Sequence, residues 1–168
     1  AEATVTRWLL ASSGVPGANS YSVSVAHSVK RPLEARVWYA YPDQPDHVFV
    51  GRGRVPSRTG RVLDDNTSQI TQATVNTQGQ VTSRTDPVGR QTTYTYAANG
   101  IDLLEVRQIR TGGSDLLAQY ATYNALHLPA TVTDAAGQTT TFTYNTAGQV
   151  LTATNAKQET TTYAYDAA

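Results

Sequence analysis

Two short stretches near the end of the chain, residues 139–144 and 160–165, place aromatic side chains at every second position among threonines and alanine. Alternation with a period of two is typical of a β-strand whose faces differ in burial. Threonine, phenylalanine and tyrosine also favour strands, because they fit a pleated and half-buried surface. The pattern therefore predicts strands in which Phe142 and Tyr144 share one face and the intervening threonines share the other.

Polar turn signals separate these strands. Residues 134–137 read Asp-Ala-Ala-Gly and residues 145–148 read Asn-Thr-Ala-Gly. The side chain of Asp or Asn can bond to its own backbone, and glycine adopts the positive φ that a tight turn needs. Tyr123, Tyr144 and Tyr165 recur 21 residues apart, which indicates an internal repeat of two strands and two turns. The fold class we predict is an all-β array of antiparallel β-hairpins.

The 21-residue register runs from residue 56 onward, so we predict a regular array over residues 56–168 and degenerate β repeats over residues 1–55. One copy is longer, because Gly100 and His127 are 27 residues apart instead of 21. The six extra residues fall near 110–115, where the composition predicts a flexible hairpin loop. The residues predicted to form the repeat turns are Gly79, Asp86, Gly89, Gly100, Asp134, Gly137 and Gly148.

Two apolar stretches are ambiguous between helix and strand. Residues 101–109 place Ile101, Leu104 and Gln108 at helical spacing, yet they occupy a position where neighbouring copies have strands. Residues 5–11 are too short for periodicity to decide. We predict strands in both, and further strands at residues 20–29, 36–41 and 48–50.

The composition argues against several classes of partner and of stabilising site. The 168 residues hold 13 basic and 13 acidic side chains, and this balance gives no electrostatic signature of a nucleic-acid partner. Cysteine is absent, which excludes disulfides and thiolate metal sites. The sequence contains no run of about 18 apolar residues, so it does not predict a membrane-spanning helix. Methionine is also absent, so we expect a processed chain or a fragment of a longer one.

The repeat itself resembles a known family. A Tyr-Asn or Tyr-Asp pair, a glycine three residues later and a following Thr-Asp with its own glycine are seen around Tyr144 and Gly148, and around Asp86 and Gly89. This motif is similar to the RHS or YD repeats of bacterial polymorphic toxins, insecticidal toxin complexes and teneurins.

The resemblance implies hairpins that wind side by side into a spiral sheet, which closes as a shell around a variable effector. It also implies a structural role in a secreted or cell-surface protein. Three departures from the motif predict looser turns: His127 and Gln158 stand in place of glycine, and Val106-Arg107 replaces Thr-Asp.

Candidate chemistry is sparse. His27, His47 and His127 share no metal-ligand spacing, and one acidic residue per turn falls far short of the six to eight oxygens of a calcium site. Asp64 and Asp65 are adjacent, so on a strand they point to opposite faces. Members of the family carry a self-cleaving Asp-Pro segment, but residues 86–89 keep the register of an ordinary repeat turn. We therefore predict no enzyme activity, no metal site and no cofactor.

The ten tyrosines and two tryptophans allow two interpretations. They can stack on sugar rings, or they can pack against one another as a ladder that forms the core. Regular spacing favours the ladder, because packing in a repeat array must recur. The predicted core residues are Tyr94, Tyr96, Tyr123, Phe142, Tyr144, Tyr163 and Tyr165.

Trp8 and Trp38 do not recur, so they are the candidates for contact with a ligand such as a surface glycan. The other expected partners are neighbouring repeats, further copies of the chain that pair through its end strands as a fibre, and an enclosed effector.

Overall fold

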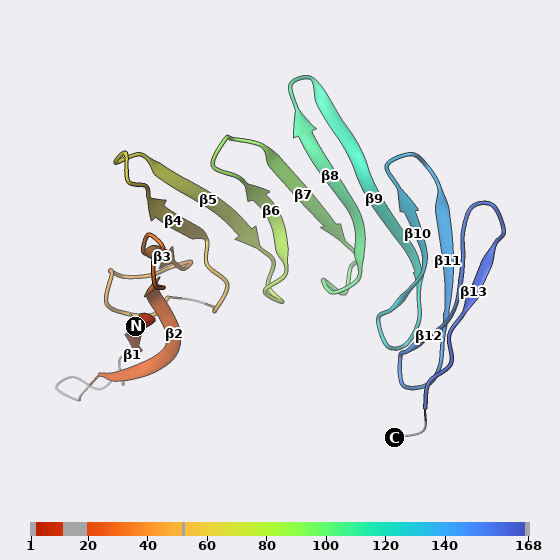
Figure 1. The fold of residues 1–168 in the computed structure, drawn as a ribbon, viewed down its shortest axis with the longest axis horizontal. Coiled ribbons are helices and arrows are strands. Elements are labelled where there is room, and N and C mark those ends of the chain that lie inside the picture. The colour runs from red at the N-terminus through yellow and green to blue at the C-terminus, as the bar shows by residue number, and fades with distance from the viewer. Residues whose placement is uncertain (1–2, 12–19, 52, 167–168) are drawn as a thin grey trace. The chain divides into compact units, whose positions relative to one another are not determined.

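The structure, a computed structural model, describes residues 3–11, 20–51 and 53–166. These residues form thirteen β-strands and no helix, which confirms the predicted all-β class. The chain divides into two units, Ala1–Gly89 (unit 1) and Arg90–Ala168 (unit 2). Within each unit the strands lie side by side in chain order (Figure 1). Among the described residues, no helix is long and apolar enough to cross a membrane.

Unit 1 contains six strands, and each pairs antiparallel with the next. They are β1 (Val5–Ala11), β2 (Tyr21–Lys30), β3 (Val37–Ala40), β4 (Arg58–Val62), β5 (Ser68–Val75) and β6 (Val81–Thr85). The strand prediction for residues 5–11 is thus confirmed.

The predicted strand at residues 48–50 is wrong. Those residues make a single parallel bridge between Phe49 and Leu10, in which the Leu10 N–H donates to Val48 and the Val50 N–H donates to Leu10. The Asp46 carboxylate accepts from the Val48 and Phe49 amides at 2.7 and 3.0 Å, which bends this segment into a loop.

The buried apolar core lies in unit 1. Leu9 and Val25 are 0% and 5% exposed, and Tyr41 is 7% exposed. The half-buried Val23, Tyr39 and Val50 pack around them. The register of β1 on β2 shifts on both sides of Trp8, and such bulges bend a strand. This cluster lies within residues 1–55, for which degenerate repeats are predicted.

Unit 2 contains seven strands, again antiparallel and paired in sequence. They are β7 (Gln91–Tyr96), β8 (Leu103–Arg110), β9 (Gly113–Tyr123), β10 (Pro129–Asp134), β11 (Thr139–Tyr144), β12 (Val150–Thr154) and β13 (Thr160–Thr162). The ambiguous stretch at residues 101–109 is the strand β8, as its position in the repeat predicted.

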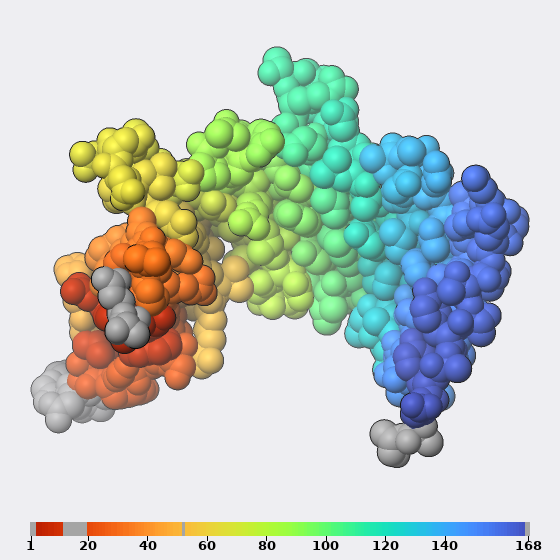
Figure 2. Space-filling model, viewed as in Figure 1, coloured from red at the N-terminus to blue at the C-terminus, as the bar shows by residue number. Residues whose placement is uncertain are grey.

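The long copy differs from its prediction. Arg110 pairs with Gly113, so β8 and β9 are joined by a two-residue turn in which Gly112 has φ 82°. The extra residues lengthen the strands instead of forming a flexible loop. An ion pair of 2.8 Å between Arg110 and Asp115 braces the tip. Figure 2 shows this tip extending beyond the turn of the β10–β11 hairpin.

The two faces of β11 follow the predicted alternation. Phe142 and Tyr144 are half-buried and their rings stack with centroids 6.4 Å apart, whereas Thr141 and Thr143 are exposed. Threonine hydroxyls on neighbouring strands are hydrogen-bonded in pairs across the sheet. The pairs are Thr74 with Thr82, Thr133 with Thr139, Thr143 with Thr152, and Thr154 with Thr160.

The predicted aromatic core is only partly formed. Tyr94, Tyr96, Tyr123, Phe142 and Tyr144 are half-buried. Tyr163 and Tyr165 are 44% and 46% exposed, contrary to the expectation of burial. They follow β13, which pairs only with β12 among the described strands, so no next hairpin covers their rings.

Candidate functional site

The repeat turns share one hydrogen-bonding scheme. In residues 145–149 the Asn145 Oδ1 accepts from the Ala147 and Gln149 amides at 3.0 and 2.9 Å, and the Gly148 N–H donates to the Asn145 carbonyl at 3.0 Å. Asp134 does the same with Ala136 and Gln138 at 2.8 and 2.9 Å. In both turns the side-chain Oδ1 therefore closes its own turn.

The predicted turn glycines have a positive φ because the turn requires it at the fourth position. Those values are 84° at Gly79, 86° at Gly89, 70° at Gly100, 77° at Gly137 and 82° at Gly148. Asp86 accepts from the Val88 amide at 3.0 Å, so the Asp-Pro segment has the contacts of an ordinary repeat turn.

The expected loosening at His127 and Gln158 is wrong. Both residues adopt the left-handed conformation of the glycine that they replace, with φ 58° and 66°. Their amides donate to Asn124 and Asn155 at 3.0 and 2.9 Å, the same lengths as in the glycine turns. The side-chain clamp of the asparagine fixes the turn, so the substitution stores backbone strain instead of opening the turn.

Tyrosine hydroxyls connect successive strands in a way that the sequence analysis missed. Tyr41 donates to the Ala26 carbonyl, Tyr144 to Pro129 and Tyr165 to Val150, each at 2.8 Å and each 15 residues upstream. The constant spacing is the signal that sequence reasoning overlooked: it treated these rings as apolar surface. Tyr144 thus anchors a strand end, and the Asn145 that follows it closes the turn.

Tyr123 makes the same bond to Leu103, but 20 residues upstream. Five of the six extra residues of the long copy therefore lie between acceptor and donor. The sixth lies in the preceding turn, where the Ala97 N–H donates to the Asp102 carbonyl at 2.8 Å. This hydrogen bond spans one residue more than the corresponding bond from the Asn145 N–H to the Gln149 carbonyl. Ala97 also lacks the oxygen that normally closes the turn, and Asn99 provides it to the Ile101 and Asp102 amides.

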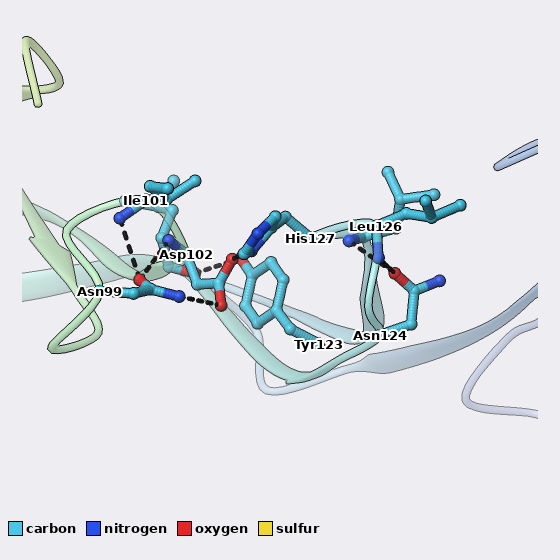
Figure 3. Close-up of polar contacts among 9 residues, drawn as sticks. Asn99, Ile101, Asp102, Tyr123, Asn124, Leu126 and His127 are labelled. Atoms are coloured by element: carbon cyan, nitrogen blue, oxygen red, sulfur yellow. Dashed lines mark hydrogen bonds and ion pairs between the residues drawn. The ribbon is translucent and has the colours of Figure 1, made fainter.

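This enlarged turn and the His127 turn meet in a polar cluster that has no counterpart in the regular copies. The His127 Nδ1 lies 2.7 Å from Asp102 Oδ1, and the Asn99 Nδ2 donates to Asp102 Oδ2 at 2.7 Å. Both turns lie at the same end of the strands of unit 2: one precedes β8 and the other follows β9. Figure 3 shows the Asp102 carboxylate between Asn99 and His127, beside the Tyr123 ring. We call these four residues the Asp102 cluster.

The hydrogen bonds of this cluster matter for stability because its carboxylate is buried. Asp102 is 9% exposed, and a buried carboxylate needs partners for its oxygens. Its two oxygens each have one nitrogen partner, from Asn99 and from His127. Burial raises the pKa of Tyr123, and the negative charge of Asp102 raises that pKa further. The Tyr123 hydroxyl therefore stays protonated and donates its hydrogen bond throughout the neutral range.

A His–Asp pair also forms two of the three members of a hydrolytic triad, in which the imidazole activates a hydroxyl nucleophile. Among the described residues the hydrogen-bond partner of the His127 ring is Asp102, and no group of three metal-binding side chains occurs. The arrangement serves to tie two turns of unit 2 together. The insertion and the His127 substitution, which are separate departures in the sequence, fall in adjacent copies and meet here.

The tryptophans singled out from the sequence both lie in unit 1. Trp8 and Trp38 are 51% and 38% exposed, on the strands that flank β2. The His27 ring meets Trp38 edge to face at 5.2 Å, and the His27 and His47 centroids are 6.5 Å apart. The fold therefore brings together two histidines that are 20 residues apart in the sequence.

Comparison with protein families supports the repeat interpretation. Residues 76–100 and 123–160 match the RHS Repeat family, which confirms the resemblance seen in the sequence. No significant match was found among curated proteins.

Several solved structures share the fold. The crystal structure of TcdB2-TccC3-Cdc42 aligns with 84% of this chain at a TM-score of 0.61 and 11% identity. The Tc holotoxin pore of Photorhabdus luminescens aligns with 84% at a TM-score of 0.60 and 12% identity. The chain spans only 8% and 7% of the length of those chains. At such low identity, the likeness is one of fold.

Proposed function

Since this chain carries RHS repeats at residues 76–100 and 123–160, we propose that it is a structural, non-enzymatic segment of a wall in a secreted or cell-surface RHS-type protein. Its recurring residues serve the sheet itself: tyrosine hydroxyls anchor strand ends, Asn and Asp close turns, and threonines pair across strands. That use of the recurring residues is the observation that carries the proposal. An active site would instead require a singular group of reactive side chains.

The two outer strands differ in how they can be extended. The outer edge of β1 is partly covered, because Leu10 exchanges two backbone hydrogen bonds with Val48 and Val50 at 2.9 and 2.8 Å. Beyond β13, Tyr165 is anchored to Val150 and is followed by Asp166, which is the Tyr-Asp signal of another turn. Further hairpins therefore add at the β13 edge, and this favours growth of a wall over a head-to-tail fibre.

The direct test is electron cryo-microscopy of the parent gene product. We expect the strands of each unit to form part of the sheet of a shell, with another hairpin paired to β13 and a lumen on one side. The segment would be excluded as part of a wall if it formed an isolated domain with the β13 edge in solvent.

The fibre alternative is tested on the 168-residue chain alone. Sedimentation velocity over a range of concentrations should show no open-ended growth, because the β1 edge is partly covered. The matched control is Thr162→Pro, because the Thr162 N–H points away from β12 and its loss leaves the β12–β13 ladder intact. Concentration-dependent filaments that Thr162→Pro abolishes would support the fibre and contradict the one-sided growth that we propose.

A further inference from the structure

A small hollow on unit 1 lies over a glycine, because the missing side chain leaves the surface of the sheet open there. Trp38 on β3, Gly60 on β4 and Ile70 on β5 are directly opposite one another in the sheet. A Cβ added to Gly60 would meet nothing within 4 Å, so the space above this glycine is open. The resulting cavity has a volume of about 290 Å³, and His27 and Arg58 also contribute to its lining. We call it the Trp38 cavity.

Its aromatic wall is fixed in position. The Trp38 ring packs against the His27 ring in a T-shaped arrangement, with the ring centroids 5.2 Å apart. The Arg36 guanidinium lies 5.8 Å from the centre of the same ring, and it also donates to the buried Ser28 hydroxyl at 3.1 Å. An indole that is held in this way, with more than a third of its surface exposed, offers a preformed stacking face.

Positive groups lie at the cavity. Arg58 lines it, and Arg7 and Arg36 lie close enough to act on the charge of the lining residue His27. Two carboxylates of the same unit are engaged elsewhere: Glu34 faces Arg61 at 3.8 Å, and Asp46 caps two backbone amides. Within the described part of the chain, no ion pair forms with Arg7, Arg36 or Arg58.

The titration of His27 is consistent with this field. Burial lowers the pKa of His27, and the positive charges of His47, Arg7 and Arg36 lower it further. The imidazole is therefore a neutral edge of the cavity near pH 7, and the positive charge comes from the arginines.

From these observations we propose that the Trp38 cavity binds a single carboxylated sugar ring, of the uronic or sialic acid class. The apolar face of the ring stacks on Trp38 over Gly60, and the carboxylate pairs with the exposed Arg58 guanidinium, whose planar fork matches a carboxylate. The volume is close to the lower end of the roughly 300–1,000 Å³ of small-molecule sites, which suits one ring. The proposal stands apart from the wall function and adds a binding surface to it.

The test compares two sugars that differ at one carbon. Glucuronate and glucose are titrated into the 168-residue chain and followed by saturation-transfer NMR and tryptophan fluorescence, with N-acetylneuraminate as a second carboxylated probe. We expect glucuronate to bind at least about tenfold more tightly than glucose, because a charge-assisted pair with Arg58 is available only to the acid.

Variants locate the site. Gly60→Thr fills the open space with a residue that favours strands and should abolish saturation transfer while the circular dichroism spectrum is unchanged. Arg58→Gln should weaken glucuronate about tenfold and leave glucose unaffected. Arg84→Gln removes another exposed arginine of unit 1, outside this cavity, and should change neither affinity.

Four results would overturn the proposal, and three of them concern the sugars. The first is equal affinity for glucuronate and glucose. The second is unchanged glucuronate binding in Gly60→Thr, and the third is the absence of saturation transfer from either carboxylated sugar. Competition by inorganic phosphate that matches glucuronate in strength would identify a generic anion site and would also contradict the stacking role of Trp38.

Discussion

Units 1 and 2 have the same strand topology but are stabilised differently. Unit 1 buries Leu9, Val25 and Tyr41 almost completely. In unit 2 the buried residue among those described is Asp102, a polar one, and every apolar side chain keeps some exposure. Unit 2 is nevertheless the part with the most regular repeats.

The difference indicates that repeated hydrogen bonds provide part of the stability that a buried apolar core provides elsewhere. Net hydrogen-bond contributions are about 0.5–1.5 kcal/mol each, and each regular copy repeats the same turn bonds, hydroxyl anchor and threonine pair. Such a sum of nearest-neighbour terms is typical of repeat arrays. Unit 1 has bonds of the same kinds, such as the Tyr41 anchor and the Thr74–Thr82 pair, and it adds the burial of apolar side chains.

The largest effect should follow from removing a core side chain of unit 1. Leu9→Ala should lower the free energy of unfolding by about 2–5 kcal/mol, the range for fully buried leucines. Both tryptophans lie in unit 1, so tryptophan fluorescence during urea unfolding reports this unit, and circular dichroism in the same titration measures the variant in unit 2. Leu117→Ala, at a position 41% exposed on β9, is the control and should cost less than about 1 kcal/mol. Similar losses at both positions would refute the contrast between the units.

The next largest effect tests the aromatic face of unit 2. Tyr144→Ala should cost about 2–3 kcal/mol, somewhat less than a fully buried aromatic residue, because its ring is half-exposed. Tyr144→Phe removes only the hydrogen bond to Pro129 and should cost about 1 kcal/mol. Thr141→Ala on the opposite face should change little. Circular dichroism during urea unfolding measures all three, and equal small losses would overturn the assignment of the faces.

The Asp102 cluster predicts coupling between two turns. His127→Gly relieves the positive φ but leaves Asp102 without one of its two nitrogen partners, so the net loss should be about 1 kcal/mol. Asp102→Asn in the His127→Gly background should cost less than Asp102→Asn alone. A double-mutant cycle should give a coupling energy of about 1 kcal/mol or more. Additive effects would show that the two turns are independent.

The smallest effect on stability at neutral pH concerns the hydrogen bonds that tyrosine hydroxyls donate to backbone carbonyls. This effect grows as the pH rises above 10. Burial raises the pKa of Tyr41, Tyr123 and Tyr144 above the usual value near 10. A raised pKa in the folded state means that the contribution to stability is fully present below pH 10 and is lost as the pH rises through the folded value. Tyrosinate absorbance and circular dichroism should change together above pH 10. Ionisation of these tyrosines without loss of structure would contradict the anchoring role.

Much of the fold could be predicted from local patterns. Alternation fixed the strands, and the 21-residue spacing fixed their order, because hairpins that repeat must pair with their neighbours. The exceptions have physical reasons. Residues 48–50 have a strand-like composition, but the Asp46 cap turns them away. The tip at residues 110–115 looks flexible by composition, yet cross-strand pairing extends both strands through it.

The candidate sites were less predictable. Aromatic spacing predicted burial for Tyr163 and Tyr165, but burial depends on a following hairpin that local sequence does not include. The Asp102–His127 contact joins residues 25 positions apart, and the Trp38 cavity joins three strands across a glycine. Both arise from register, which is set only when the whole sheet is assembled.

Amide hydrogen exchange in unit 2 tests most directly whether its hairpins hold one another without a buried apolar core. We expect slow exchange for the ladder amides of β9 to β12, and the fastest exchange among the strands of this unit in β13, which has one neighbour. Tyr144→Phe should accelerate exchange in β10 and β11 but not in unit 1. Exchange of all unit 2 amides at the rate of an unfolded chain, with unit 1 protected, would contradict the account.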